Sequence, residues 1–305
     1  MKPHLFEVSV EIRSDWEKPL FTGKLVKSIL IESEPSLKKF FEKKMGDAPK
    51  LLHITPLYKI NGDKIECVYS RVISNKNGIP IVNPVKINGR YSFYIGLLDG
   101  DLEGSLSYDL AFKTLTNISG EIFFKNHMFK VELISMREID VEKISREAVR
   151  NLLKNNMIKM IFSSPTLLKD PFREGKYKSL IPTPMNIFSV PASIYLYLHG
   201  RYSKKNLLQI LKILHRVINE THSLIRGETD KGTIEKVFVQ YEEKKNPIPS
   251  IIGYSNYRIN QRHLEQYQKK IDIEKLLKDI ITIILTLGTG TSRATGFGHI
   301  TTKSK

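Results

Sequence analysis

The order of strand-like and helix-like segments repeats along the chain, and this repeat constrains the fold more than any other feature. Strands are predicted where apolar and polar residues alternate, and helices where apolar residues recur every three or four positions. In the first half the patterns predict a strand, two helices, strands, a helix and a hairpin, at residues 5–14, 21–31, 36–44, 50–60, 63–73, 90–98, 105–116 and 120–139. In the second half they predict a strand, helical segments, two strands, a helix and a strand, at residues 156–164, 188–200, 204–220, 233–243, 250–259, 271–287 and 297–303.

The same βαββαβ order therefore occurs twice. This order is that of a ferredoxin-like sandwich, in which helices cover one face of a sheet. We predict an α+β protein of two tandem ferredoxin-like (RRM-like) domains, residues 1–145 and 146–305, with their boundary in the charged connection 141–155. Thr22 and Ser36 are predicted to cap the first two helices, because a hydroxyl group can accept a bond from a free backbone N–H group of the first turn.

The composition is that of a packed globular protein. Of the 305 residues, 41% are hydrophobic and 26% are charged, which argues against a disordered chain. No stretch approaches the roughly 18 apolar residues that would span a bilayer, and the first residues alternate like a strand rather than a signal peptide. We therefore expect a cytoplasmic protein with no membrane partner. The single cysteine, Cys67, excludes an internal disulfide framework and a cysteine-based zinc cluster.

The charge is strongly basic and unevenly distributed. The formal net charge is +16, and an excess of this size favours a polyanionic partner such as a nucleic acid. Residues 1–150 contain 23 Lys and Arg against 20 Asp and Glu, whereas residues 151–305 contain 25 against 12. The second half therefore carries most of the positive field. A proteome rich in lysine is the alternative explanation, but it does not account for the asymmetry.

A glycine-rich loop, LGTGTSRATGFGHI, occupies residues 287–300. P-loops and Rossmann turns lead from a strand into a helix, whose free N–H groups hold the phosphate. This loop leads from a helix into a strand and lacks the GK[ST] ending, so neither ATP nor a dinucleotide is expected and no cofactor is predicted. Its donors instead suit the sugar-phosphate backbone of a nucleic acid, and they are Thr289, Thr291, Ser292 and Arg293. A long structural turn with Gly288 as the helix C-cap is the alternative.

The glycine spacing also carries a resemblance. The pattern G-x-G-x5-G-x-G, between the last helix and the last strand of a tandem ferredoxin-like chain, resembles the C-terminal signature of the RAMP superfamily. More narrowly, the chain resembles an archaeal, histidine-free member of the Cas-six family, the CRISPR repeat-RNA processing endoribonucleases. Weaker similarities extend over most of the chain, at the basic first helix GKLVKSIL and at residues 161–169, 182–196 and 251–254.

The resemblance implies a metal-independent endoribonuclease that cuts CRISPR repeat precursor RNA into guide RNAs. In such enzymes the 2′-hydroxyl attacks the adjacent phosphate and leaves a 2′,3′-cyclic phosphate and a 5′-hydroxyl. This reaction needs proton transfer and donors that stabilise a pentavalent phosphorane. The sequence contains neither a clustered Asp/Glu set nor the His/Cys spacing of a metal site, and no metal is predicted.

The predicted catalytic residues are cationic. Many members of the family use a histidine just after the first helix, but residues 22–52 contain none. The resemblance to histidine-free members implies that Lys24 and Lys27 lie at the scissile phosphate, and their spacing places them on one helix face. A lysine with an ordinary pKa of about 10.4 is a poor base, so stabilisation of the phosphorane is the expected role. A solvated basic face is the alternative, and Arg226 and Lys231 are further catalytic candidates.

RNA binding is predicted at two loops. Lysines and arginines of loops can track phosphates without reading the sequence. The candidates lie in the glycine loop and in the basic loop 165–180, and they are Gly288, Gly290, Ser292, Arg293, Gly296, Gly298, Lys169, Arg173, Lys176 and Lys178. Tyr254 and Tyr257 could stack a base, although strand tyrosines more often pack within a sheet. His53 is expected to be structural.

Three functions remain open from the sequence. The first is the endoribonuclease, with CRISPR repeat RNA as its partner. The second is a noncatalytic RAMP-type RNA-binding subunit of an effector complex, which the missing histidine favours, and the third is a structural protein. By resemblance alone, a homodimer and association with a CRISPR surveillance complex are further predicted partnerships.

Overall fold

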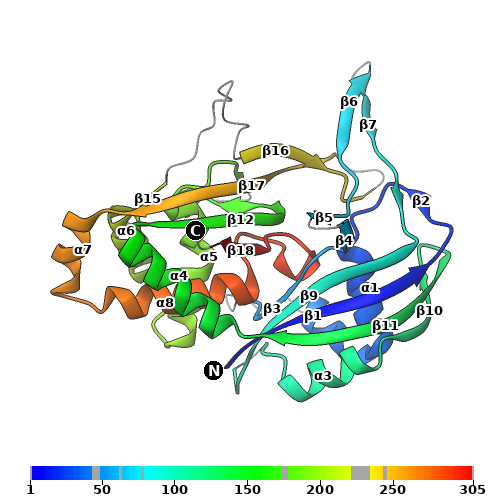
Figure 1. Ribbon diagram of the computed structural model, residues 1–305, viewed down its shortest axis with the longest axis horizontal. Helices are drawn as coiled ribbons and strands as arrows, with labels where there is room; N and C mark the ends of the chain where they lie inside the picture. The colour runs from blue at the N-terminus through cyan, green and yellow to red at the C-terminus, as the bar shows by residue number, and fades with distance from the viewer. Residues whose placement is uncertain are drawn as a thin grey trace. The chain divides into compact units, whose positions relative to one another are not determined.

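The computed structural model describes residues 2–42, 49–61, 64–76, 79–102, 104–173, 178–220, 234–242 and 246–303. The chain divides into two compact units (Figure 1). The first contains residues 1–139, 237–249 and 293–297, and the second contains residues 140–236, 250–292 and 298–305. Two short segments from the C-terminal half therefore belong to the first unit, and both contribute to the site described below.

The first unit is built on an antiparallel sheet with the strand order β10-β11-β1-β9-β4-β5, in which β3 also pairs with β9. The strands are β1 (Lys2–Arg13), β3 (Leu52–Ile54), β4 (Tyr58–Asn61), β5 (Lys64–Cys67), β9 (Gly89–Asp99), β10 (Ser119–Phe124) and β11 (His127–Ile139). Strand β1 is central, and Val8 lies opposite both Phe93 of β9 and Met136 of β11. Two small ribbons accompany the sheet, β2 (Glu17–Lys18) with β8 (Val85–Lys86) and β6 (Val72–Lys76) with β7 (Ile79–Val82).

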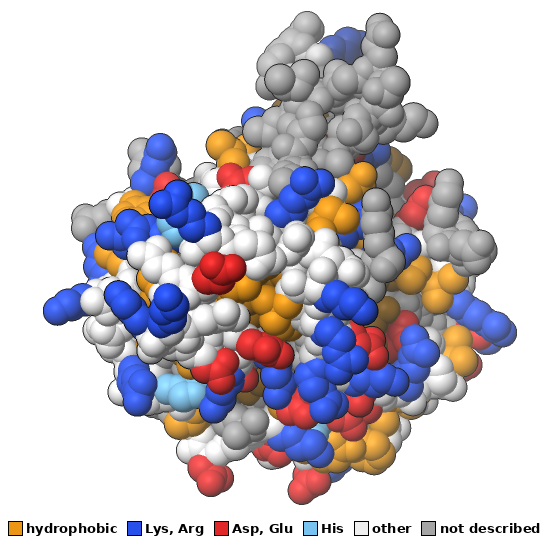
Figure 2. Space-filling view, turned by 60° about the vertical axis from the view of Figure 1, so that its left-hand side comes forward, with side chains coloured by type: hydrophobic (Ala, Val, Ile, Leu, Met, Phe, Trp, Pro, Cys, Tyr) orange, Lys and Arg blue, Asp and Glu red, His pale blue; other side chains and the backbone are white. Residues whose placement is uncertain are grey.

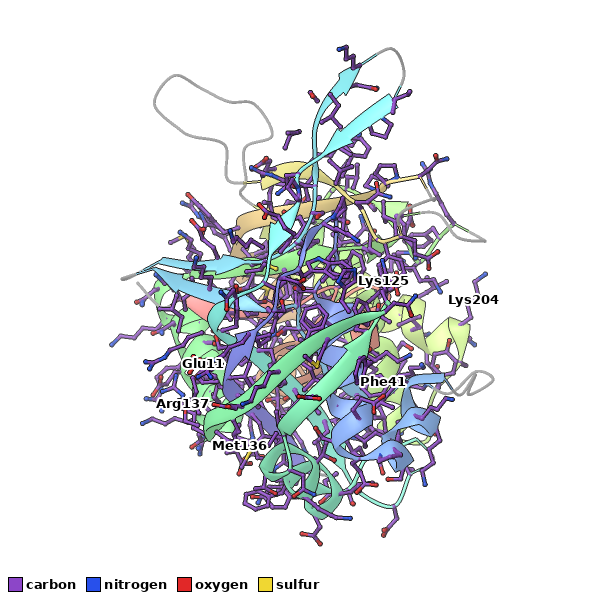
Figure 3. All side chains as sticks on the ribbon, turned by 90° about the vertical axis from the view of Figure 1, so that its right-hand side faces the viewer. Glu11, Phe41, Lys125, Met136, Arg137 and Lys204 are labelled. Atoms are coloured by element: carbon purple, nitrogen blue, oxygen red, sulfur yellow. The ribbon has the colours of Figure 1, made fainter. Side chains whose placement is uncertain are left out.

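Alternation along β1 decides which face of this sheet is buried. Phe6, Val8, Val10 and Ile12 are buried in the core, whereas Glu11 lies on the other face (Figure 3). The helices pack on the apolar face because their own apolar residues recur at helical spacing. They are α1 (Gly23–Ser33), the 3-10 helix η1 (Pro35–Leu37), α2 (Lys38–Glu42) and α3 (Tyr108–Thr116).

The second unit has the same topology. Its antiparallel sheet has the order β15-β17-β12-β18, with β16 paired to β17. The strands are β12 (Met157–Thr166), β15 (Ile218–Glu220), β16 (Ile234–Val239), β17 (Ile248–Ile259) and β18 (Ile300–Lys303), and β13 (Leu168–Lys169) pairs with β14 (Lys178–Ser179). The helices are α4 (Val141–Asn155), α5 (Pro184–Leu198), α6 (Lys204–Val217), α7 (Gln261–Gln268) and α8 (Ile273–Leu287). In each unit the first strand of the βαββαβ repeat, β1 or β12, lies in the sheet between the third and the fourth strands of that repeat. This is the ferredoxin-like arrangement predicted from the sequence.

Three local predictions were wrong. Thr22 does not cap α1 with its side chain, because its buried hydroxyl donates to the Val68 carbonyl and accepts from Leu57 N at 3.0 Å. Ser36 lies within η1, where the Glu34 carboxylate accepts from its backbone N–H group. The segment 204–220 is not helical throughout, since α6 ends at Val217 and the next three residues form β15.

The glycine loop begins as predicted, with Gly288 as the C-cap of α8. The segment 141–155 is helical and forms α4, capped by Asp140. Among the helices in the described part of the chain, none has the length and apolar character needed to cross a membrane.

Candidate functional site

Helix α1 presents two lysines beside a buried face. Gly23, Leu25, Val26 and Ile29 are buried, whereas the predicted catalytic residue Lys27 is only partly buried. The helix begins immediately after Phe21, whose ring stacks on Phe297 with centroids 4.4 Å apart and planes at 21°. The start of α1 is thus fixed against the end of the glycine loop within the first unit.

The backbone of the glycine loop lies so close to the start of α1 that both segments need glycine there. A Cβ atom on Gly23 would lie 2.3 Å from the Thr295 carbonyl oxygen, and one on Gly296 would lie 3.0 Å from the Cα of Gly23. Gly296 also has φ 107°, which side chains rarely adopt. The loop therefore contacts the start of α1 through backbone that only glycine permits.

Lys24 has an acidic and an aromatic neighbour. Its Nζ atom lies 3.3 Å from Oε1 of Glu242 and 4.0 Å from the centroid of the Tyr241 ring. Tyr241 in turn packs against Phe21 and Phe297, with ring centroids 5.8 and 5.9 Å away. The ion pair holds the Lys24 ammonium group in place, and the ring adds a cation–π contact to it.

Lys27 meets a third lysine that the sequence did not single out. The Nζ atom of Lys27 lies 5.4 Å from the centroid of Phe41, a residue of α2 labelled in Figure 3. The ammonium group of Lys50 donates to the backbone carbonyl of the same Phe41. Burial, and then the positive charges of Lys27 and Arg293, lower the pKa of Lys50. These contacts bring cationic side chains from α1 and from residue 50 to one place.

Arg293 is buried beneath this cluster. Its side chain is 7% exposed, and Nη2 donates to the backbone carbonyl of Lys50 at 2.9 Å. Burial lowers the pKa of the guanidinium group to about 10. The Arg293 carbonyl lies 3.1 Å from Nδ1 of His53, which is fully buried. The sequence led us to expect Arg293 as an exposed phosphate donor; the structure instead places its guanidinium in the interior, where it fixes the backbone at Lys50.

The remaining glycines of the loop pack against the second unit's own backbone. A Cβ atom on Gly290 would lie 2.3 Å from the Leu167 carbonyl oxygen, and one on Gly298 would lie 2.0 Å from that of Thr289. These close contacts require glycine at Gly290 and Gly298, so a structural turn, the alternative considered from the sequence, accounts for more of the loop than Gly288. Thr289, named as a phosphate donor, is buried and donates to the Ile187 carbonyl.

The two predicted RNA-binding loops meet within the second unit. Lys178 Nζ donates to Oγ1 of Thr291 at 2.6 Å, and the Thr291 backbone N–H group donates to the Leu167 carbonyl at 2.9 Å. Ser292 has φ 62°, the left-handed conformation of a tight turn. This pair therefore places one basic side chain on the rim of the glycine loop.

The other basic candidates are spread over the surface. Lys169 is exposed, and Arg173 Nε lies 3.4 Å from the Asp170 carboxylate. Lys176, Arg226 and Lys231 lie outside the described residues. Figure 2 shows Lys and Arg side chains distributed over a whole face, interspersed with acidic ones, rather than in one patch.

The aromatic candidates differ in exposure. Tyr257 is fully buried and donates its hydroxyl hydrogen to the Pro182 carbonyl at 2.7 Å, so it is not available to stack a base. Tyr254 is partly exposed, and Lys159 Nζ lies 3.4 Å from its ring centroid. Only Tyr254 therefore retains the stacking role considered from the sequence.

Two histidines near these positions are buried. His53 is buried as expected, and burial lowers the pKa of His299 to about 4, so its imidazole is neutral at physiological pH. In the described ranges, no group of three His, Cys, Asp or Glu residues could hold a metal ion. The titratable side chains described at α1 include Lys24, Lys27 and Lys50, with Glu242 paired to Lys24.

Sequence reasoning missed Lys50, Tyr241 and Glu242. Lys50 is the first residue of the strand predicted at residues 50–60, and that pattern carries no information about its charge. Its hydrogen bond to Phe41 of α2 and its electrostatic interaction with Lys27 of α1 are tertiary contacts. Tyr241 and Glu242 are far from Lys24 in sequence and reach it because residues 237–249 fold into the first unit. The one available signal was the abrupt end of the strand pattern near residue 243.

Comparisons with known proteins agree with this architecture. Residues 5–139 match the Cas6 N-terminal domain family. The structure is similar to a Cas6 product complex, with 14% identity over 99% of both chains and a TM-score of 0.57. It is also similar to Thermus thermophilus Cas6, with 13% identity over 99% of this chain and 98% of that one and a TM-score of 0.52. A third similar structure represents a Cas6-related gene from Pyrococcus furiosus, with 13% identity over 100% of both chains and a TM-score of 0.53.

No curated protein matches the chain in sequence. At these identities the structural likeness establishes the fold, which comprises two ferredoxin-like domains. The family match covers residues 5–139, and the structural likeness extends the agreement in fold to the whole chain.

Proposed function

We propose that the protein is a metal-independent endoribonuclease that cleaves CRISPR repeat precursor RNA to guide RNAs. The observation that carries the proposal is the convergence of Lys27 and Lys50 on Phe41, beside the start of α1 and above the buried Arg293. This cluster lies in the unit that contains the Cas6 N-terminal match. A group of fixed positive charges is what an RNA phosphate that gains negative charge during reaction requires.

The proposed reaction begins with attack of the RNA 2′-oxygen on the adjacent phosphorus. The 2′-hydroxyl passes its proton to solvent water, a pentavalent phosphorane forms, and the bond to the 5′-oxygen breaks. The products are a 2′,3′-cyclic phosphate and a 5′-hydroxyl, and the leaving oxygen must gain a proton. Lys24 and Lys27 are proposed to stabilise the phosphorane, because ammonium groups held in place need little reorganisation when charge develops.

Lys50 is proposed to protonate the 5′-oxygen. Its pKa is lowered by burial and by the neighbouring charges of Lys27 and Arg293. A lower pKa makes the ammonium group a stronger acid than an ordinary lysine. The Arg293 contact to its backbone carbonyl holds this segment beside α1.

RNA binding is proposed to involve the glycine loop and the basic loop 165–180. Lys178, Lys169 and Arg173 are the described basic side chains that can contact phosphates there. Contributions from Ser292, Arg226, Lys231 and Lys176 stay predictions, as do a homodimer and association with a surveillance complex.

A noncatalytic RNA-binding subunit is the second candidate. The observation that favours it is the burial of His53, the histidine nearest to α1 in sequence, whose Nδ1 atom lies 3.1 Å from the Arg293 carbonyl oxygen. Such a subunit would bind RNA without cleaving it, and the lowered pKa of Lys50 would then have no role in its function.

Incubation of the purified protein with end-labelled repeat RNA in EDTA tests the proposal. We expect one cut that leaves a 2′,3′-cyclic phosphate and a 5′-hydroxyl. Tight binding without a cut after prolonged incubation would support the noncatalytic subunit instead. Cleavage that appears only after addition of Mg²⁺ would refute the metal-independent mechanism.

A further inference from the structure

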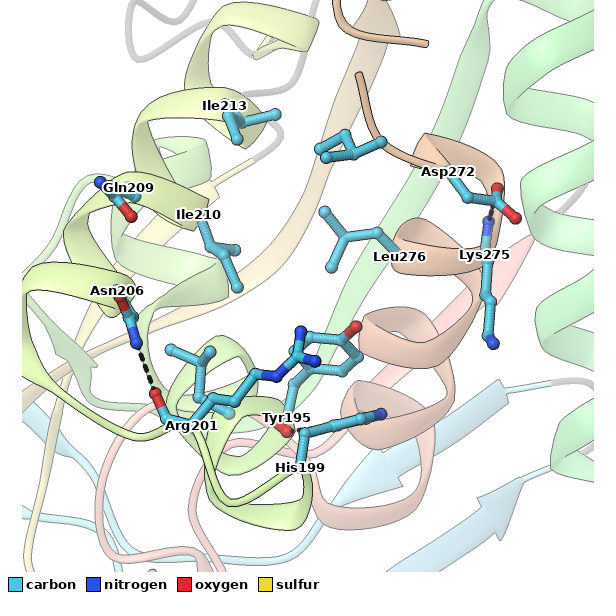
Figure 4. Close-up of a pocket in the computed structure, with 12 residues that line it drawn as sticks. Tyr195, His199, Arg201, Asn206, Gln209, Ile210, Ile213, Asp272, Lys275 and Leu276 are labelled. Atoms are coloured by element: carbon cyan, nitrogen blue, oxygen red, sulfur yellow. Dashed lines mark hydrogen bonds between the residues drawn. The ribbon is translucent and has the colours of Figure 1, made fainter. Parts of the chain in front are cut away.

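A groove in the second unit is lined by residues other than the described ones assigned above. It is bordered by α6 and by the start of α8, with α5 along its floor, and its volume is about 560 Å³ (Figure 4). This volume is in the range of sites that bind ligands or anchor side chains. Lys24, Lys27 and the described residues of the two predicted RNA-binding loops do not line it.

One half of the groove is aliphatic. Ile210 and Ile213 of α6 face Leu276 of α8 across it (Figure 4), and Ile271 completes this half from the turn before α8. Ile271 is 36% exposed although it is a branched aliphatic residue. Apolar side chains that line a concave surface without covering one another indicate a binding site rather than ordinary surface composition.

The other half is polar and cationic. Tyr195 and His199, from the end of α5, have ring centroids 4.3 Å apart, and Arg201 extends beside them in Figure 4. The backbone of Arg201 is fixed on both sides, because its N–H group donates to the Leu196 carbonyl at 2.9 Å and its own carbonyl accepts from Asn206 Nδ2 at 2.8 Å. The positive side chain is thus anchored at one end of the aliphatic wall.

A second cation lies on the α8 wall. Lys275 borders the groove together with Asp272, whose carboxylate accepts from the Lys275 backbone N–H group at 2.9 Å and caps α8. The acidic charge is therefore engaged with the helix terminus. An occupant with carboxylates at its edges would complement Arg201 and Lys275.

We propose that this groove docks an amphipathic, acidic helix of a partner protein. A helix places aliphatic side chains three and four residues apart, which matches a wall of isoleucine and leucine. Glutamates beside those residues would meet Arg201 and Lys275. A nucleobase fits less well, because a base binds by stacking on an exposed aromatic ring. The one tyrosine that lines the groove, Tyr195, already packs against His199. The proposal does not depend on RNA cleavage.

A fluorescein-labelled synthetic helix tests it on the full-length protein. The probe carries leucines at intervals of three and four residues, flanked by glutamates, and the comparison peptide replaces every glutamate by lysine. We expect the glutamate probe to bind at least tenfold more tightly than the lysine peptide, measured by fluorescence anisotropy. Ile271→Glu should weaken its binding at least tenfold. Ile181→Glu is the matched control, because Ile181 is 47% exposed in the same unit and does not line the groove.

Charge reversal provides an independent readout. In the double variant Arg201→Glu, Lys275→Glu, the preference should invert, so that the lysine peptide binds more tightly than the glutamate probe. Circular dichroism checks that the variants stay folded, and the double variant keeps the test decisive if Ile271→Glu unfolds. Equal affinity for both peptides, or equal losses in the Ile271 and Ile181 variants, would overturn the proposal. A third result would also overturn it. If single-stranded RNA binds the wild type, and its affinity falls in Ile271→Glu but not in Ile181→Glu, the groove is a nucleic-acid site.

Discussion

The guanidinium group of Arg293 donates to the backbone carbonyl of Lys50 at 2.9 Å, although the two residues are 243 positions apart. Through this bond, a residue of the glycine loop fixes the position of a lysine beside α1. The loop is therefore part of the framework that arranges the cationic cluster. This relationship changes what substitutions at either residue should do.

Arg293→Ala should reduce stability more than RNA affinity. Removal of the buried guanidinium leaves the Lys50 carbonyl without this donor, which costs about 1–3 kcal/mol of the free energy of unfolding. A side chain that binds phosphate would instead affect the salt dependence of RNA binding, whose logarithmic slope falls by about 1 when one such cation is removed. Denaturant unfolding and RNA titrations at several salt concentrations separate the two. A reduced slope with unchanged stability would show that the side chain binds RNA.

Lys27→Ala should slow cleavage at least tenfold with little change in RNA affinity. The reason is that a charge used to stabilise the phosphorane contributes more in the transition state than in the bound substrate. Single-turnover rates at saturating protein measure the effect, and Lys39→Ala, an exposed lysine of α2, is the control. An unaltered single-turnover rate would remove Lys27 from the mechanism.

Lys50→Arg should change the pH dependence of cleavage. A general acid must be protonated, so the wild-type rate should fall as pH rises through the lowered pKa of Lys50, before the ordinary lysine value of about 10.4 is reached. Arginine stays protonated throughout this range, and its variant should lose that descending limb while cleaving more slowly at neutral pH. Rates measured from pH 6 to about 10 test this, with Lys59→Arg as the control. Superimposable profiles for wild type and Lys50→Arg would exclude Lys50 as the acid.

Glu242→Gln should strengthen RNA binding at low salt. The Glu242 carboxylate lies 3.3 Å from Lys24 Nζ and offsets its charge. Both side chains are partly exposed, so the ion pair itself contributes little to stability. We expect RNA affinity to rise by about twofold to fivefold and the gain to shrink as salt screens the charge. Glu121→Gln, on the exposed face of β10, removes the same charge elsewhere in the unit and should have a smaller effect.

Periodicity was sufficient to predict the fold, because each unit buries one face of its sheet. The alternation in β1 and the apolar spacing in α8 are local signals, and both elements lie where they were expected. The site was less accessible to sequence reasoning. Lys24 and Lys27 were predicted from the resemblance of the first helix, and their spacing placed them on one helix face. Lys50 and Glu242 approach them through tertiary contacts that no local pattern encodes. Arg293 was misjudged for the same reason, since a charged residue in a glycine loop is normally exposed.

Gly296→Ala should destabilise the protein more than alanine at a glycine with open surroundings. Gly120 is the matched control: it has φ 121°, similar to the 107° of Gly296, but a Cβ atom there would meet nothing within 4 Å. Alanine at Gly120 should therefore add only the backbone strain of about 1–2 kcal/mol. At Gly296 the new methyl group would also lie 3.0 Å from the Cα of Gly23 and 3.3 Å from Pro56 N, and relief of this crowding should cost about 1–3 kcal/mol more. Thermal and denaturant unfolding midpoints measure the difference. Equal midpoints for the two variants, together with weaker RNA binding by Gly296→Ala alone, would mean that this glycine is required for access of RNA rather than for the close approach to α1.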